Sequence, residues 1–287
     1  MSPQTLLVTG ASGQLGRLVL EALLERHPAE RLVAAVRHPA AVADLAARGV
    51  QVREADYTRP ETLRSAFQGV DRLLLISSNA IGQRTAQHRA VVEAARAAGV
   101  GLLAYTSVLR ADTSPLGLAR EHVETEALVR ASGLPWVFLR NGWYTENHTA
   151  SLPAILAHGA VLGAAGEGRF ATAARADYAA AAAQVLLADH PEGQTLELAG
   201  DTAYTLADLA GEIARQTGKP IVYRDLPQAE FAGALTAAGL PGAFADLLAD
   251  SDAGAKQGGL DDAGGQLSRL IGRPTTPLAE TVRRALA

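Results

Sequence analysis

The chain has 287 residues, enough for one large domain or for a domain with a smaller partner. Its net charge of −4 supplies no basic surface to neutralise phosphates, which argues against nucleic-acid binding. The absence of cysteine excludes disulfides, thiol catalysis and cysteine-ligated metals. No signal-peptide pattern and no apolar run of ~18 residues is present, so we expect a soluble cytoplasmic protein without a membrane segment.

The first half of the sequence alternates short apolar runs with helical patterns. The apolar runs predict buried strands at residues 5–10, 31–37, 50–56, 71–78, 101–107 and 135–141. The segments between them predict helices at residues 14–27, 39–48, 60–68, 83–98 and 115–132. Strand and helix repeated in this way predict an α/β fold with a Rossmann-like, doubly wound parallel sheet.

Several of these helices have recognisable ends. Thr58, before Arg59-Pro60-Glu61, is the expected N-cap of the third helix. Glycines at 69, 99 and 133 are expected to end helices in a left-handed conformation.

The pattern loosens after about residue 150. Residues 151–159 and 177–189 predict helices, and residues 194–200 predict a strand that returns to the sheet. Residues 205–218 form an amphipathic helical pattern, with Thr205 as N-cap and Gly218 as stop. Residues 251–265 are rich in glycine and predict a mobile loop.

The domain plan follows from these elements. We expect a cofactor domain at residues 1–150, rejoined by about residues 176–200. A smaller, mainly helical lobe at residues 151–287 is expected to cover the substrate.

The segment "VTGASGQLG" carries glycines at the junction of the first strand and first helix. A glycine turn lets backbone N–H groups approach a pyrophosphate and aims a helix N-terminus at its charge. The residues predicted to bind a dinucleotide here are Gly10, Ser12, Gly13, Gln14, Leu15 and Gly16. Glycine turns also end strands for steric reasons, so the context in the first strand–helix unit carries the prediction.

Polar residues at the ends of the next strands extend this prediction. Arg37 stands where proteins that read the ribose 2′-hydroxyl of NAD have an acidic residue, and a guanidinium there favours the 2′-phosphate of NADP. The alternative is a solvated surface arginine. Asp56 suits either the adenine amino group or an ordinary cap. The sequence also predicts that Ser77, Ser78 and Asn79, at the end of the fourth strand, contact the cofactor.

The helix "LAREHVETE" and the segment "RNGWYTENH" complete the motifs. None of the six tyrosines is followed by a lysine four positions later, so the Tyr-x-x-x-Lys pair of short-chain dehydrogenases is absent. His122 and Glu126 are expected to lie one above the other on the helix. They are interpreted as a hydrogen-bonded pair, a catalytic or substrate-contacting pair, or a metal pair that lacks a third ligand.

Together with "ARADYAAAAAQVL" and "GRPTTPLAETVRRAL", these motifs resemble the NmrA-like group of atypical short-chain dehydrogenases/reductases. Within the group the chain is most similar to the bacterial type 2 class of NADPH:quinone oxidoreductases, and the resemblance spans nearly the whole chain. Compared with the family pattern, Leu118 stands in place of the tyrosine of the Tyr/Lys pair and His122 stands in place of its lysine.

The resemblance implies NADP (NADPH) as cofactor and a small quinone as substrate. It implies that the segment from Asn141 and Gly142 borders the nicotinamide, with Trp143 and His148 beyond it. The catalytic residues expected on this basis are Gln14, His122, Tyr144 and Asn147. No metal is expected.

Hydride transfer to a quinone makes a delocalised phenolate, with a pKa of about 10 like that of tyrosine, which water or a histidine can protonate. A missing Tyr/Lys pair is therefore tolerable for this substrate. An NmrA-like redox sensor that binds the dinucleotide without turnover is the alternative function, and a sugar-nucleotide epimerase is disfavoured because such enzymes use the pair. The sequence leaves open whether the chain forms a homodimer.

Overall fold

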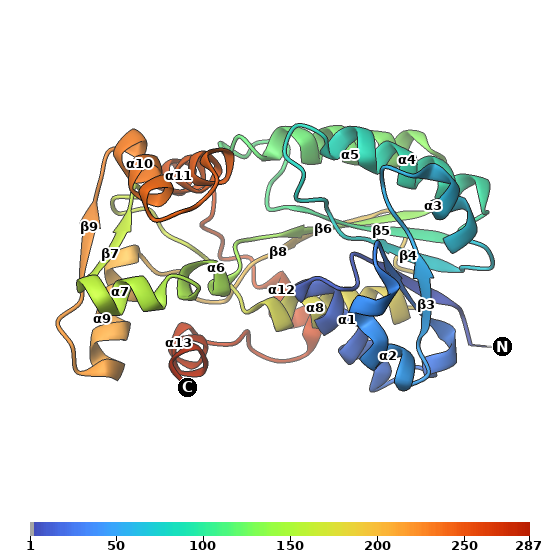
Figure 1. Ribbon diagram of the computed structural model, residues 1–287, viewed down its shortest axis with the longest axis horizontal. Helices are drawn as coiled ribbons and strands as arrows, with labels where there is room; N and C mark the ends of the chain where they lie inside the picture. The colour runs from blue at the N-terminus through green and yellow to red at the C-terminus, as the bar shows by residue number, and fades with distance from the viewer. Residues whose placement is uncertain (1–2) are drawn as a thin grey trace. The chain divides into compact units, whose positions relative to one another are not determined.

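The computed structural model describes residues 3–287 and contains a seven-stranded sheet (Figure 1). The strand order is β3-β2-β1-β4-β5-β6-β8. The strands are β1 (Leu6–Thr9), β2 (Leu32–Val36), β3 (Gln51–Glu54), β4 (Arg72–Leu75), β5 (Leu102–Val108), β6 (Trp136–Asn141) and β8 (Gln194–Leu198). The pairs β1–β2, β1–β4, β2–β3 and β4–β5 are parallel. The predicted α/β fold with a doubly wound sheet is confirmed.

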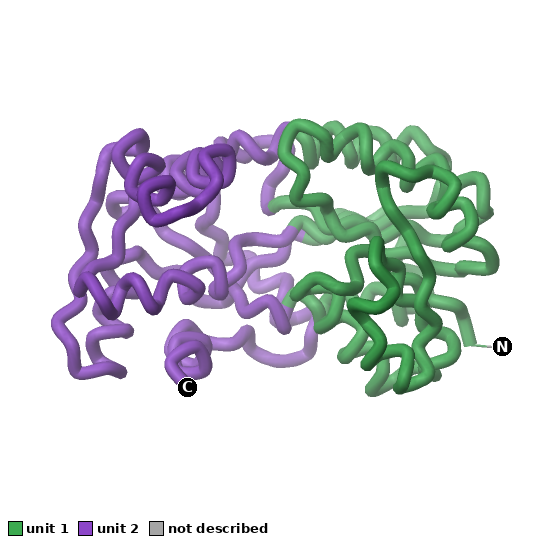
Figure 2. The backbone as a smooth tube through the Cα atoms, in the orientation of Figure 1, with its two compact units in different colours: residues 1–108, 121–140, 178–196 green, residues 109–120, 141–177, 197–287 purple. Residues whose placement is uncertain are grey.

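The chain divides into two compact units, each built from three segments (Figure 2). Unit 1 comprises residues 1–108, 121–140 and 178–196, and unit 2 comprises residues 109–120, 141–177 and 197–287. The predicted domain boundary near residue 150 stays a prediction.

Helices cover both faces of the sheet in unit 1. Figure 1 shows α3, α4 and α5 over one face and α1, α2 and α8 over the other. Their bounds are α1 (Gln14–Leu24), α2 (Ala43–Ala47), α3 (Pro60–Ala66), α4 (Arg84–Ala97), α5 (Ala119–Ala131) and α8 (Arg175–Leu187), with 3-10 turns at Ala29–Arg31 and Pro39–Val42. All residues of β1, β2 and β5 are buried, because helices lie on both faces of their sheet.

The order of the strands reverses between β1 and β4. The chain moves from β1 outward to β2 and β3, and then returns to β4 on the other side of β1. In sheets of this kind ligands bind beyond the carboxyl ends of the strands at this switch point. The segments that follow β1 and β4 are therefore the first place to look for a site.

Unit 2 has its own small sheet and core. Its strands β7 (Ala160–Gly163) and β9 (Val222–Asp225), which the sequence did not predict, pair in parallel. Its helices are α6 (Thr145–Thr149), α7 (Leu152–His158), α9 (Leu206–Thr217), α10 (Gln228–Ala237), α11 (Gly242–Lys256), α12 (Gln266–Ile271) and α13 (Leu278–Leu286). The apolar face of α9 packs Leu206, Leu209 and Ile213 into this core. Within residues 3–287, no helix combines the length and apolar character that a bilayer span requires.

Two expectations about local structure are wrong. The N-cap of α3 is Arg59, while the Thr58 hydroxyl bonds the Asp56 carboxylate. The segment 251–265 is not a loop throughout, because α11 continues to Lys256. A Cβ added at Gly254 would lie 2.9 Å from the side chain of Leu116, so this glycine serves close packing. By contrast, the predicted capping of α9 is confirmed, since Thr205 and Asp208 form a reciprocal capping box.

Candidate functional site

The glycine turn after β1 forms an open cradle at the start of α1. Gly10 has a φ of +58°, and its carbonyl accepts a hydrogen bond from the Gly13 N–H at 2.9 Å. A Cβ at Gly16 would lie 2.5 Å from the Gly10 oxygen, so only glycine fits there. Ser12, Gly13 and Gln14 are exposed, and Leu15 and Gly16 are buried. No side chain caps the N-terminus of α1, which leaves its positive end available to an anion.

The ends of β2 and β3 place Arg37 and Asp56 near each other. Arg37 is exposed and makes no hydrogen bond or ion pair within the described part of the chain, residues 3–287. Asp56 accepts bonds from the backbone N–H and the hydroxyl of Thr58, both at 2.8 Å. The Thr58 N–H is the main cause that lowers the pKa of Asp56, and the charge of Arg37 contributes. The capping role of Asp56 is thus present, and its contact with adenine stays a prediction.

The end of β4 lies beside the glycine turn. A Cβ at Gly10 would lie 3.7 Å from the Cβ of Ile76. The Tyr57 hydroxyl lies within hydrogen-bond distance of both Thr9 Oγ1 (2.6 Å) and the Ile76 carbonyl (3.1 Å). Ser77, Ser78 and Asn79, which are predicted to contact the cofactor, directly follow Ile76 in the sequence.

The structure therefore brings together the cofactor residues predicted in unit 1. They follow β1, β2, β3 and β4, which are neighbours in the sheet, so they share its carboxyl edge. In unit 2 it brings together the residues that follow β6, described below.

His122 lies inside unit 1 rather than at this edge. It is 5% exposed, and its Nδ1 lies 2.7 Å from the Tyr105 hydroxyl. Burial is the main cause that holds the pKa of His122 well below its ordinary value, so the ring is neutral. The expected hydrogen bond between His122 and Glu126 is wrong, because both residues bond other partners. The burial favours a structural role, and the catalytic role of His122 stays a prediction.

Glu126 forms a buried ionic cluster instead. It accepts from the Ser107 hydroxyl at 2.6 Å and from Arg140 Nε and Nη2 at 2.8 and 2.7 Å. Arg130, one turn further along α5, adds a contact at 3.1 Å. Glu126 is fully buried and Arg140 is 4% exposed. The cluster ties α5 to β5 and β6.

The segment after β6, in unit 2, is held by polar contacts that the sequence did not reveal. The Asn141 side chain is buried and hydrogen-bonds the Tyr144 hydroxyl. Its Oδ1 atom has no hydrogen-bond partner among residues 3–287. Arg175 lies over the Tyr144 ring at 4.8 Å, and its Nη2 lies 3.5 Å from Asn147 Oδ1. The Gly142 N–H donates to the Leu198 carbonyl at 2.7 Å.

His148 belongs to a second polar network in the same unit. Its Nδ1 lies 2.8 Å from the Tyr204 hydroxyl, which accepts from the Thr172 hydroxyl at 3.1 Å. Burial lowers the pKa of His148 to about 4, so the ring is neutral at pH 7. No local pattern could have revealed Tyr204 or Thr172, because they are distant in sequence from the residues they hold.

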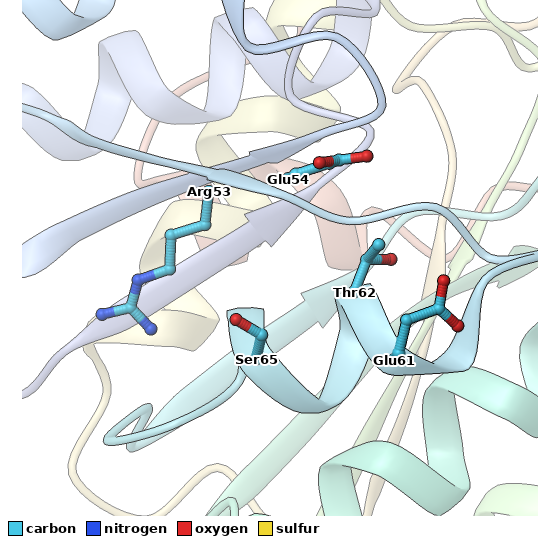
Figure 3. A pocket seen from close by; sticks show the side chains of 5 residues that line it. All are labelled: Arg53, Glu54, Glu61, Thr62 and Ser65. Carbon is cyan, nitrogen blue, oxygen red and sulfur yellow. The ribbon is translucent and has the colours of Figure 1, made fainter.

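Two surface hollows lie away from the glycine turn. The hollow in Figure 3 has a volume of about 380 Å³ and is lined by Arg53, Glu54, Glu61, Thr62 and Ser65. Arg53 donates to the carbonyls of Ala66 and Gln68 at the end of α3, and both glutamates pair with Arg59. These contacts are structural. The second hollow, in unit 2, is lined by Gly166, Glu167, Gly168, Tyr223, Asp225 and Lys256. Across residues 3–287, no three His, Asp or Glu side chains group in a way that could hold a metal ion.

Comparison with known proteins places this geometry in a family. A family model described as NAD(P)H-binding matches residues 10–189. The chain is 57% identical over 275 residues to Quinone oxidoreductase 2 of Escherichia coli (strain K12), covering 96% of each chain. It is 30% identical to an NmrA-like family domain-containing oxidoreductase of Aspergillus flavus, covering 98% of this chain and 94% of the relative.

A solved structure agrees. The crystal structure of an NADPH-dependent quinone oxidoreductase from Escherichia coli, complexed with NADPH, superposes with a TM-score of 0.96 at 55% identity. The match covers 98% of this chain and 100% of that one. The chain belongs to the NAD(P)H-binding, NmrA-like group of atypical short-chain dehydrogenases/reductases.

Proposed function

We propose that this chain is an NADPH-dependent quinone oxidoreductase. The observation that carries the proposal is its 57% identity, over 96% of both chains, to the quinone oxidoreductase of Escherichia coli. The intact glycine cradle at the carboxyl edge of the sheet supports it.

The residues of unit 1 fit the phosphates of the cofactor. Gly10, Gly13 and Gly16 carry no Cβ that would crowd the turn, and the uncapped start of α1 offers N–H groups to the pyrophosphate. Arg37 is exposed at the end of β2 with no competing ion pair within residues 3–287, so its guanidinium is available to a 2′-phosphate. When bound, NADPH supplies the hydride.

Proton supply is the step for which this chain lacks the usual residues. Leu118 has no acidic proton, and the neutral His122 is buried against Tyr105. Reduction of a quinone tolerates this, because a hydroquinone anion with a pKa of about 10 takes its proton readily from water at pH 7. We therefore infer that solvent supplies the proton.

The roles of the residues after β6 rest on the resemblance and stay predictions. In unit 2 the unpartnered Oδ1 of the buried Asn141 is an acceptor suited to a ligand N–H group. The roles of Gln14, Gly142, Tyr144 and Asn147, the cytoplasmic location and the homodimer likewise depend on sequence alone.

The decisive experiment follows NADPH absorbance with and without 1,4-benzoquinone or a naphthoquinone, in parallel with NADH. We expect quinone-dependent oxidation of NADPH and slower oxidation of NADH. Tight NADPH binding without quinone-dependent oxidation would favour the redox-sensor function instead. His122→Gln in the same assay is expected to lower thermal stability while leaving kcat nearly unchanged, and a large loss of kcat at unchanged KM would return His122 to the catalytic residues.

A further inference from the structure

Ser78, at the end of β4, is held by three side chains of α4. Its N–H donates to His88 Nε2 at 2.9 Å, and its carbonyl accepts from Arg84 Nε at 2.7 Å. Its hydroxyl donates to Gln87 Oε1 at 2.5 Å. Both backbone groups and the side chain of one loop residue are thus engaged by a single helix turn.

The contacts of His88 assign its tautomer. Because Nε2 accepts from the Ser78 N–H, the ring proton is on Nδ1, which lies 2.9 Å from Thr125 Oγ1 on α5. The Thr125 hydroxyl donates its own proton to the Glu121 carbonyl at 2.8 Å, so its oxygen is free to accept from Nδ1. His88 is fully buried, and burial lowers its pKa to about 3, so the acceptor at Nε2 persists at all ordinary pH values.

The segment from Ile76 to Ser78, which leads into this loop, begins next to the glycine turn, since a Cβ built at Gly10 would lie 3.7 Å from the Cβ of Ile76. The preceding residue is fixed as well, because the Ser77 N–H donates to Thr106 Oγ1 at 2.9 Å. A loop held in one conformation before its ligand arrives spares the ligand the entropic cost of ordering it.

We propose that His88, through Ser78, is a positioning residue that holds the β4–α4 loop in its dinucleotide-binding conformation, with Thr125 selecting the required tautomer. This inference rests on the proposed function for the identity of the ligand. Arg84 and Gln87 complete the anchor. The effect belongs to NADPH binding and not to the chemical step, because His88 is fully buried and acts on the loop through the Ser78 N–H.

The test compares His88→Leu, which removes the acceptor, with His88→Gln, whose side-chain oxygen can accept from the Ser78 N–H. Val91→Ala is the matched control, because Val91 is fully buried on the same helix and packs in the apolar core of unit 1. NADPH fluorescence gives Kd without any quinone, and hydrogen exchange reports the Ser78 amide directly.

For His88→Leu we expect a Kd for NADPH raised roughly fivefold to thirtyfold, because the half-buried Ser78 N–H loses its acceptor, and we expect faster exchange at Ser78. KM for NADPH should rise while kcat at saturating NADPH holds. His88→Gln should recover most of the affinity, and Val91→Ala should lower Tm and leave Kd unchanged.

Unchanged NADPH affinity in His88→Leu, or an equal loss of affinity in Val91→Ala, overturns the proposal. If His88→Leu does not fold, Thr125→Val is the second variant: it is nearly isosteric, and it removes the partner of Nδ1 together with the hydroxyl's bond to the Glu121 carbonyl. It should raise Kd roughly threefold, and an unchanged Kd there overturns the proposal too. A wild-type protein that binds NADPH but reduces no quinone would contradict the proposed function and leave these binding measurements valid.

Discussion

Replacing Glu126 by leucine tests the buried ionic cluster of unit 1. The substitution removes four contacts, three of them at 2.8 Å or less, and takes the carboxylate of Glu126 away from the buried guanidinium of Arg140. Breaking a buried pair in this way costs about 3–5 kcal/mol. For a chain of this size each kcal/mol shifts Tm by about 2–4 °C, so we expect Tm to fall by about 6–20 °C.

Thermal unfolding followed by circular dichroism measures this loss, and two variants serve as controls. Arg130→Ala removes an exposed partner of the same carboxylate and a cation–π contact with Phe138 at 4.6 Å, together about 1–2 kcal/mol. The double variant Glu126→Leu/Arg140→Met removes both buried charges and should recover most of the loss. If Glu126→Leu lowers Tm no more than Arg130→Ala does, the buried cluster does not stabilise unit 1.

Three further predictions follow from single residues. Arg37→Asp should reduce the preference for NADPH over NADH by about ten- to a hundredfold, measured as the ratio of kcat/KM values, and an unchanged ratio would remove its proposed role. Gly16→Ala should abolish most NADPH binding, because its Cβ would lie 2.5 Å from the Gly10 oxygen, whereas Gly211→Ala, with open space at its Cβ, should bind normally. Burial raises the pKa of Asp252 to about 6, so the stability it contributes is complete below about pH 4 and is lost as pH rises through 6. Relative to Asp252→Asn, the wild type should therefore lose about 2 kcal/mol of unfolding free energy between pH 4 and pH 7, measured by urea unfolding of both proteins. A difference between the two proteins that is the same at both pH values would contradict this.

The sequence predicted the central strands of the sheet well because they are buried on both faces. Such strands read as continuous apolar runs, as the seven buried residues of β5 illustrate. The residues at the carboxyl edge were also predictable, because glycines, Arg37 and Ser77–Asn79 directly follow those runs.

Local patterns carried less information about contacts between distant segments. In the Ser78 anchor, Ser78 bonds His88, which lies 10 positions away, and His88 bonds Thr125, which lies 37 positions further along the chain. The local sequence around these residues does not indicate either contact. Glycine in residues 251–265 predicted flexibility, yet glycine also permits tight packing, as Gly254 against Leu116 shows. Whether a glycine gives flexibility or tight packing depends on the residue that packs against it, and only the folded structure shows which residue that is.

The division of the chain has a consequence for its synthesis. Each unit consists of three segments, so the polypeptide crosses between them five times. On the ribosome, residues 1–108 emerge long before residues 178–196, which complete the same unit. At about 5–20 residues per second, the 88 residues from 108 to 196 take roughly 4–18 s to translate. During that interval β1 to β5 have been synthesised but β8 and most of α8 have not. A nascent chain that stalls at this stage is the form most in need of a chaperone.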